Sequence, residues 1–194
     1  MKLQQLETNR LLLRGWNDSD LDMFYRINSD PQVMEFFPAL LNREQSNHLA
    51  QRIRDHFKQY GWCFWAVEEK FSQKFIGMVG LATITFSAEG IEPGQIEIGW
   101  RLSRERWGQG FATEAAEASL NFAFKTIAAP EILSFTTIKN LRSQAVMKRL
   151  GMQHVGNFNH PKVASDSPVY PHVLYKLKAN QWRKKQTQIA SNTF

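Results

Sequence analysis

The chain has 194 residues, of which 43% are hydrophobic and 12% are aromatic. This composition excludes a disordered protein and predicts a single domain, residues 1–194, with a core of its own. The formal net charge of +6 favours an anionic partner, which by charge alone is nucleic acid, a membrane surface or a phosphorylated small molecule.

Three features of the sequence restrict the cellular compartment and the kinds of partner that we predict. Cys63 is the one cysteine, which excludes an internal disulfide framework, and its apolar neighbours predict a buried thiol. Residues 1–7 lack the apolar core of a signal peptide, and no run approaches the roughly 18 apolar residues of a membrane helix. The basic residues are scattered, and their one cluster, at 183–185, lies in a polar tail expected from about residue 183. We therefore predict a cytoplasmic protein with no nucleic-acid and no membrane partner.

The first half of the chain predicts strands and helices in alternation. The expected elements are a strand at 10–14, helices at about 17–28 and 42–60, and strands at 62–68 and 75–85. Asp30 and Pro31 interrupt the first helix, and Gly61 ends the second. The last two strands form an antiparallel pair, because the connection between them is short.

The second half begins with a turn-rich loop at 87–94. The elements expected after it are a strand at 96–102, a helix that starts near 111 and is closed by Pro130, a strand at 132–138, a helix at 141–150 ended by Gly151, and strands at about 152–158 and 173–177. A strand, a helix and a strand in this order predict a parallel pair with a crossover.

The segment from Trp107 to Ala115 contains Gly108 and Gly110 at the junction between the strand and the helix. Two glycines let the backbone turn sharply, and the free N–H groups at the start of the helix favour an anion. A pyrophosphate therefore fits, although an ordinary turn has the same glycine pattern. Neither a Walker loop nor Gly-x-Gly-x-x-Gly is present, so ATP and NAD are not indicated.

Four motifs follow one another along the chain: the opening Glu7 to Arg14, the central Glu97 to Leu102, the segment Trp107 to Ala115, and Asn140-x-x-Ser143 with Leu150-Gly151-Met152. Together they resemble the GNAT acyltransferase superfamily over nearly the whole chain. Within it they look like the branch of ribosomal-protein N-terminal acetyltransferases (RimJ/RimL-like) and many small-amine acetyltransferases. The resemblance implies an α/β (α+β) fold: a mixed, mostly antiparallel twisted sheet of about seven strands, a splayed parallel pair at its centre, and about four helices.

The resemblance also implies acetyl-CoA as the acetyl donor. The residues that would bind it are Leu102, Ser103, Trp107, Gly108, Gln109, Gly110, Phe111, Ala112, Thr113 and Asn140. Trp107 occupies a position at which the superfamily has Arg or Gln, so phosphate binding would rest mainly on backbone N–H groups. The N–H near Leu102 is the expected donor to the thioester carbonyl.

The catalytic candidates implied by the resemblance are Glu97 and Ser143. Glu97 matches a carboxylate that takes the proton of the acceptor ammonium, and the competing interpretation is a salt bridge with Arg101 or a solvated charge. The Tyr with which many members protonate the leaving thiolate is Met147 here. Ser143 would then donate through water, while Asn140 holds the pantetheine, unless the pair merely caps a helix.

The resulting expectation is a direct N-acetyltransferase that acts on a small-molecule or peptide amine as a monomer or homodimer. The alternative is a CoA-binding regulatory domain with little turnover. No histidine and carboxylate set has metal-ligand spacing, so we expect no metal, and no covalent acyl-enzyme. His160 and His172, in the loop before the last strand and at its start, could tune or relay protons near neutral pH, but a hydrogen-bonding surface residue is the favoured interpretation of each.

Overall fold

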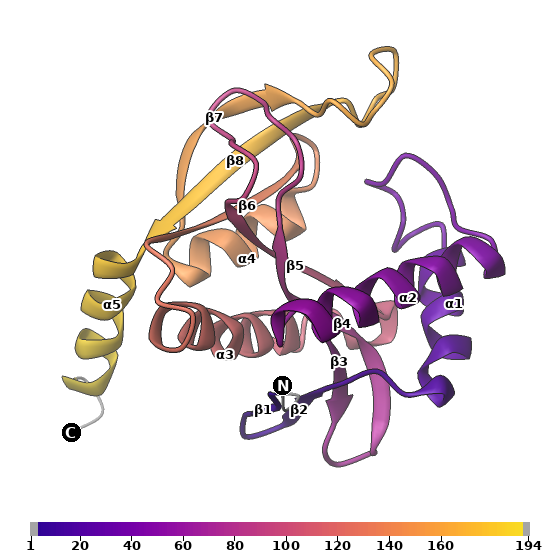
Figure 1. Cartoon of the computed structure of the whole chain (residues 1–194), viewed down its shortest axis with the longest axis horizontal. Helices are drawn as coiled ribbons and strands as arrows, with labels where there is room; N and C mark the ends of the chain where they lie inside the picture. The colour runs from indigo at the N-terminus through magenta and orange to yellow at the C-terminus, as the bar shows by residue number, and fades with distance from the viewer. Residues whose placement is uncertain (1–3, 192–194) are drawn as a thin grey trace. The chain divides into compact units, whose positions relative to one another are not determined.

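A computed structural model describes residues 4–191, which form eight strands and five α-helices (Figure 1). The elements are β1 (Leu6–Glu7), β2 (Leu11–Arg14), α1 (Leu21–Ser29), α2 (Arg43–Tyr60), β3 (Phe64–Glu69), β4 (Lys74–Thr83), β5 (Ile96–Leu102), α3 (Phe111–Lys125), β6 (Glu131–Thr137), α4 (Leu141–Leu150), β7 (Gln153–Asn159), β8 (Pro171–Lys178) and α5 (Ala179–Ser191), with 3-10 turns at Asp18–Asp20 and Arg104–Arg106. The strand order is β1-β2-β3-β4-β5-β6-β8-β7. The predicted mixed, mostly antiparallel fold is confirmed.

The chain divides into two compact units. Unit 1 comprises the described residues up to Ala82 together with Ile98–Ser119. Unit 2 comprises Thr83–Glu97 and the described residues from Leu120 onwards. The strand β5 and the helix α3 each begin in one unit and end in the other.

Unit 1 is built on antiparallel pairing of β2 with β3 and of β3 with β4, as the short connections predict. Its core combines the inward side chains of these strands with one face of α1 and α2. Fully buried members of this core are Leu11, Leu13, Phe24, Trp65, Val67, Val79 and Leu81. Gly77 has φ of +139°, and any side chain there would clash with the carbonyl oxygen of Arg101, so β4 and β5 approach each other more closely than a Cβ permits.

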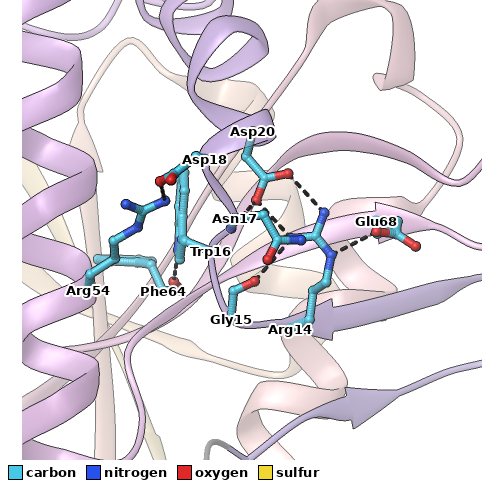
Figure 2. A network of polar contacts seen from close by, with 9 residues as sticks. All are labelled: Arg14, Gly15, Trp16, Asn17, Asp18, Asp20, Arg54, Phe64 and Glu68. Atoms are coloured by element: carbon cyan, nitrogen blue, oxygen red, sulfur yellow. Dashed lines mark hydrogen bonds and ion pairs between the residues drawn. The ribbon is translucent and has the colours of Figure 1, made fainter.

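A buried arginine fixes the turn that leads from β2 into α1 (Figure 2). Arg14 donates from both Nη atoms to the Asp20 carboxylate, each at 2.8 Å, and from Nε to Glu68 at 2.7 Å. Asp20 also accepts from the backbone N–H of Asn17 at 2.8 Å, which closes a capping box. The hydrogen bonds that Arg14 donates to Asp20 and Glu68 raise the pKa of Arg14, and both carboxylates compensate its charge.

Unit 2 contains the parallel pair and a long hairpin. β5 and β6 run parallel, with Glu97 opposite Leu133, as the strand–helix–strand order predicts. β8 pairs antiparallel with both β6 and β7. The helix α4 has the predicted bounds and ends at Gly151, whose φ of +85° is the left-handed cap. The core on one side of this sheet contains Ile84, Ile91, Leu133, Phe158 and Leu174.

The structure differs from the predicted elements in detail. The sequence pattern missed the helix α5, which includes the polar tail with its exposed Arg183 and Lys184; just before the tail, Trp182 is buried, and its indole Nε1 donates to Asn121 Oδ1 at 3.1 Å. The helix α3 ends at Lys125, before Pro130. The predicted sheet of about seven strands has eight, because it includes the two-residue β1, which pairs with β2.

Cys63 is buried as predicted, and desolvation raises the pKa of its thiol. No helix within residues 4–191 is long and apolar enough to cross a membrane.

Candidate functional site

The glycine segment forms an open turn at the start of α3 in unit 1. Gly108 and Gly110 have φ of +73° and +82°, a left-handed conformation that glycine adopts without strain. Both are exposed, and a Cβ at Gly108 would meet nothing within 4 Å. Because α3 begins at Phe111, the first N–H groups of the helix have no intrahelical acceptor. The segment therefore has the geometry of an anion-binding turn.

Trp107 ties this turn to the end of β5. Its indole Nε1 donates to the carbonyl oxygen of Leu102 at 3.0 Å. Leu102 and Ser103 are both buried, and the Ser103 N–H donates to Ile76 O on β4 at 2.9 Å. Trp107 thus has a structural contact in place of the charge that Arg would bring to this position.

A positive charge reaches the turn from another part of the chain. Arg10, just before β2, donates from Nε to Glu114 Oε2 at 2.6 Å and from Nη1 to the carbonyl oxygen of Gln109 at 3.0 Å. Its guanidinium lies 4.4 Å above the ring of Phe111, and a Cβ at Gly110 would lie 3.4 Å from its Nη2. The sequence motif contained Arg10, but nothing local to it indicated this contact.

Glu114 joins Arg10 to the neighbouring backbone. Its Oε1 accepts from the Thr8 hydroxyl at 2.6 Å and from the Arg10 N–H at 3.0 Å. Burial raises the pKa of Glu114, but the hydrogen bonds from Thr8 and Arg10 outweigh it, and the net pKa is lowered. Glu114 is therefore a firmly ionised carboxylate in the first turn of α3, where the helix dipole also favours a negative charge.

Glu97 lies in unit 2 at the start of β5, and its side chain is half-buried. Desolvation raises the pKa of Glu97 to about 7, against the opposing effect of the Lys162 charge. Lys162 is held by a hydrogen bond from Nζ to Thr85 Oγ1 at 2.8 Å. A carboxyl group with a pKa near 7 exchanges a proton readily at neutral pH. The sequence predicted the residue as a candidate base but could not predict this pKa.

Arg101 has partners of its own in unit 1. Its Nη1 donates to Asn28 Oδ1 at 2.5 Å, and its guanidinium lies 4.0 Å above the ring of Phe37. These contacts account for the position of Arg101 without the salt bridge to Glu97 that the sequence left open.

His160 and His172 belong to an aromatic cluster in unit 2, with ring centroids 5.0 Å apart. The cluster also includes Phe86, Phe135 and Phe158. Burial lowers the pKa of both histidines, that of His160 to about 4. His172 is buried, so the expectation of a surface residue is wrong for it. Both imidazoles are neutral at pH 7.

Asn140 and Ser143 adopt the capping arrangement that was the alternative to a binding role. The Ser143 N–H donates to Asn140 Oδ1 at 3.1 Å. The Asn140 amide donates to Thr136 Oγ1 at 2.9 Å and to Ser143 Oγ at 3.1 Å. The Ser143 hydroxyl accepts from Asn140 and retains its own proton to donate. Met147, on the same helix, is 1% exposed.

Residues 10–153 match the acetyltransferase (GNAT) domain family, which is most of the chain. The chain belongs to the GNAT acetyltransferase family. Its elements, with the glycine turn between a strand and a helix, are therefore those of an acetyltransferase domain. Two relatives by sequence are YkkB of Bacillus subtilis, 28% identical over 77% of this chain and 86% of YkkB, and the N-acetyltransferase YoaA of the same species, 24% identical over 91% and 98%.

Solved GNAT structures share the fold. An acetyltransferase of Bacillus anthracis superposes with a TM-score of 0.75 at 21% identity, over 91% of this chain and 99% of the other. Mycobacterium smegmatis RimJ in complex with CoA-disulfide superposes with a TM-score of 0.71 at 17% identity, over 95% of each chain.

The residues of the turn fit the acetyl-CoA that GNAT acetyltransferases use. A Cβ at Gly110 would narrow the space beside Arg10. A phosphate is favoured by the open turn, by the free N–H groups at the start of α3 and by the charge of Arg10. Within residues 4–191, no group of three or more His, Cys, Asp or Glu side chains could hold a metal ion.

Proposed function

We propose that this GNAT domain transfers the acetyl group of acetyl-CoA directly to the primary amine of a small molecule or a peptide. The observation that carries the proposal is the Glu97 carboxyl group with a pKa of about 7, at the start of the strand whose other end meets the glycine turn. Such a carboxyl group takes the proton that an alkylammonium must lose before it can attack a carbonyl.

The donor would be bound by the turn from Trp107 to Thr113, through the N–H groups of Gly108, Gln109, Gly110, Phe111 and Ala112 and the hydroxyl of Thr113. Arg10 adds a positive charge beside Gly110. Leu102 and Ser103, at the end of β5, would lie along the pantetheine, and the Leu102 N–H would donate to the thioester carbonyl. Acetyl-CoA supplies the acetyl group as a thioester.

In the proposed reaction the amine nitrogen forms a bond to the acetyl carbon, and the carbon–sulfur bond breaks. Glu97 takes the proton that the ammonium loses before the attack, either directly or through water. The second proton, which the nitrogen loses as the amide forms, reaches the thiolate through water and the Ser143 hydroxyl, which gains one proton as it gives another, because Met147 has no proton to give. Asn140 orients Ser143 through its amide. The chain would act as a monomer or homodimer in the cytoplasm, without a metal.

We also propose that this chain belongs to the RimJ/RimL branch of the GNAT family. The fold is shared with a ribosomal-protein-S5-alanine acetyltransferase of Vibrio fischeri at 18% identity and with RimJ. The opening Thr8-x-Arg10 motif supports the same branch, because both side chains contact Glu114 next to the turn. A protein N-terminus is therefore one of the acceptors to be tried.

A CoA-binding regulatory domain is the second candidate function. The observations that favour it are the buried Met147 at the place of the usual acid and the Trp107 indole, whose Nε1 donates to the carbonyl oxygen of Leu102. Such a domain would bind CoA without turnover.

The deciding experiment measures the release of free thiol from acetyl-CoA with a panel of amines and peptide N-termini, together with the affinity for CoA. We expect release that depends on the amine and that falls in Glu97→Gln by about 100-fold or more. CoA binding with no amine-dependent release would favour the regulatory domain. Glu92→Gln, in an exposed loop of the same unit, is the control for loss of an unrelated carboxylate.

A further inference from the structure

Arg101 in unit 1 has a charge that its surroundings do not compensate. Within residues 4–191, only Nη1 has a hydrogen-bond partner, Asn28 Oδ1, and this partner is neutral. Nε is shielded from solvent and has no partner among these residues. Desolvation, with no opposing charge, lowers the pKa of Arg101 to about 10. Among the residues that the structure describes, no carboxylate pairs with this guanidinium.

The group is nevertheless firmly oriented. Asn28 is 0% exposed, and its Nδ2 donates to Ser46 Oγ at 2.9 Å, which fixes the direction of Oδ1. Ser46 is also 0% exposed and lies in the first turn of α2. The Phe37 ring, 4.0 Å away, covers one face of the guanidinium. One edge of Arg101 is therefore held by α1 and α2, and the edge formed by Nε and Nη2 has no hydrogen-bond partner in the described part of the chain.

Arg14 in the same unit shows what a purely structural arginine looks like in this protein. Its three nitrogens are engaged by the carboxylates of Asp20 and Glu68, and these hydrogen bonds raise its pKa (Figure 2). Desolvation lowers the pKa of both arginines, but at Arg101 no carboxylate opposes it, so its pKa falls where that of Arg14 rises. A desolvated guanidinium with an unpaired Nε and Nη2 edge can bind an anion that has two adjacent oxygens, as a carboxylate does.

We propose that Arg101 binds a carboxylate of the acceptor, so that the acetylated substrate is an amine that also carries a carboxylate. This inference rests on the proposed acetyl transfer. The Nε and Nη2 edge matches the two oxygens of a carboxylate, and a donor phosphate has its own site at the glycine turn. The carboxylate comes either from a free amino acid or from an acidic side chain near the N-terminus of a peptide.

The test compares acceptors in matched pairs. One arm uses free amino acids against their amides, and the other uses short peptides that begin with Glu or Asp against those that begin with Gln or Asn. In the wild-type protein we expect kcat/KM to be about tenfold or more higher for the carboxylate member of the pairs in one arm. The arm that shows the preference identifies the source of the carboxylate.

Variants of Arg101 then assign the preference to this side chain. Arg101→Gln should abolish the preference through the acceptor KM and leave the KM for acetyl-CoA unchanged, and Arg101→Lys should restore part of it. Arg104→Gln is the matched control, since Arg104 is an exposed arginine of the same unit and should leave the preference intact. Thermal unfolding of each variant shows whether a loss of the carboxylate preference comes from misfolding.

A second readout does not need turnover. The Arg101 Nε–H resonance, assigned by its loss in Arg101→Gln, should shift on titration with glutamate but not with the diamide of glutamate. Turnover with no preference in either arm, or an equal effect of Arg101→Gln on acids and amides, would overturn this inference while acetyl transfer stands. No release with any amine would refute the acetyl transfer, and an unmoved Nε–H resonance would then refute carboxylate binding as well.

Discussion

Arg10 and Glu114, 104 residues apart in the chain, form an ion pair of 2.6 Å that spans the glycine turn and the first turn of α3. Arg10 also donates to Gln109 O inside that turn, so the pair holds the backbone that would receive the phosphates. The pair is half-exposed, so its contribution to stability should be about 1 kcal/mol or less. Its effect on the donor should be larger than its effect on folding.

Replacing Arg10 should weaken donor binding selectively. Arg10→Gln should raise the KM for acetyl-CoA about tenfold, because it removes a charge beside the phosphates and an anchor of the turn. The KM for acetyl-pantetheine, which has no pyrophosphate, should change little. Arg10→Lys should recover part of the loss, and Arg26→Gln, an exposed arginine on α1, is the control. Equal loss with both donors would argue against a phosphate-directed role.

Gly110 and Gly94 allow a test of the turn with a matched control. Both are exposed, with φ of +82° and +91°. Alanine at either position should therefore lower the free energy of unfolding by a similar amount, about 1 kcal/mol. Only Gly110→Ala should also reduce CoA affinity, and Gly110→Glu should nearly abolish it by adding a negative charge. Calorimetric titration with CoA measures the difference. Undiminished affinity in a folded Gly110→Glu protein would place the phosphates elsewhere.

The pH dependence of the reaction should report Glu97. Because the pKa of Glu97 is about 7, kcat/KM should fall as pH drops below about 7, where the base becomes protonated. The Lys162 charge lowers this pKa, so Lys162→Met should move the acid limb to higher pH. In Glu97→Gln the fall of kcat/KM at acid pH should disappear, and kcat/KM should be low at every pH. A limb that does not move in Lys162→Met would mean that another group titrates.

The half-buried, neutral His160 should make the protein sensitive to acid. Its pKa of about 4 in the folded state lies below the ordinary value of 6.5, so between these values the unfolded chain binds a proton that the folded chain does not. Stability is therefore full above about pH 6.5 and falls as pH drops toward 4. Urea unfolding of His160→Gln over this range should show a shallower fall. An identical slope in the variant and the wild type would contradict a neutral His160 in the folded state.

Trp182 should anchor the C-terminal helix. It is 1% exposed and donates to Asn121, so Trp182→Ala should lower the free energy of unfolding by about 3–5 kcal/mol. Trp182→Phe keeps most of the buried area and isolates the hydrogen bond, which should contribute about 1 kcal/mol. Arg183→Ala, exposed on the same helix, should change stability by less than 0.5 kcal/mol, as is typical of surface positions. A loss of less than about 1 kcal/mol in Trp182→Ala would mean that Trp182 does not anchor α5.

The amino-acid sequence by itself determined the features that depend on near neighbours. The alternation along β5, the bounds of α4 with its caps at Asn140 and Gly151, and the left-handed turn at Gly108 and Gly110 all follow from residues within a few positions of one another. The ordered motifs also sufficed for the family, which the match over residues 10–153 confirms. The missed helix α5 has a polar composition around its single buried anchor, Trp182.

Only the tertiary structure decided which side chains are charged, paired or desolvated. The pKa of Glu97, the neutrality of His160 and the uncompensated charge of Arg101 arise because residues distant in sequence exclude water or supply a countercharge. The contact of Arg10 with Glu114 likewise depends on how β2 lies beside the start of α3. Desolvation and ion pairing are properties of position in space, and local sequence patterns do not encode that position.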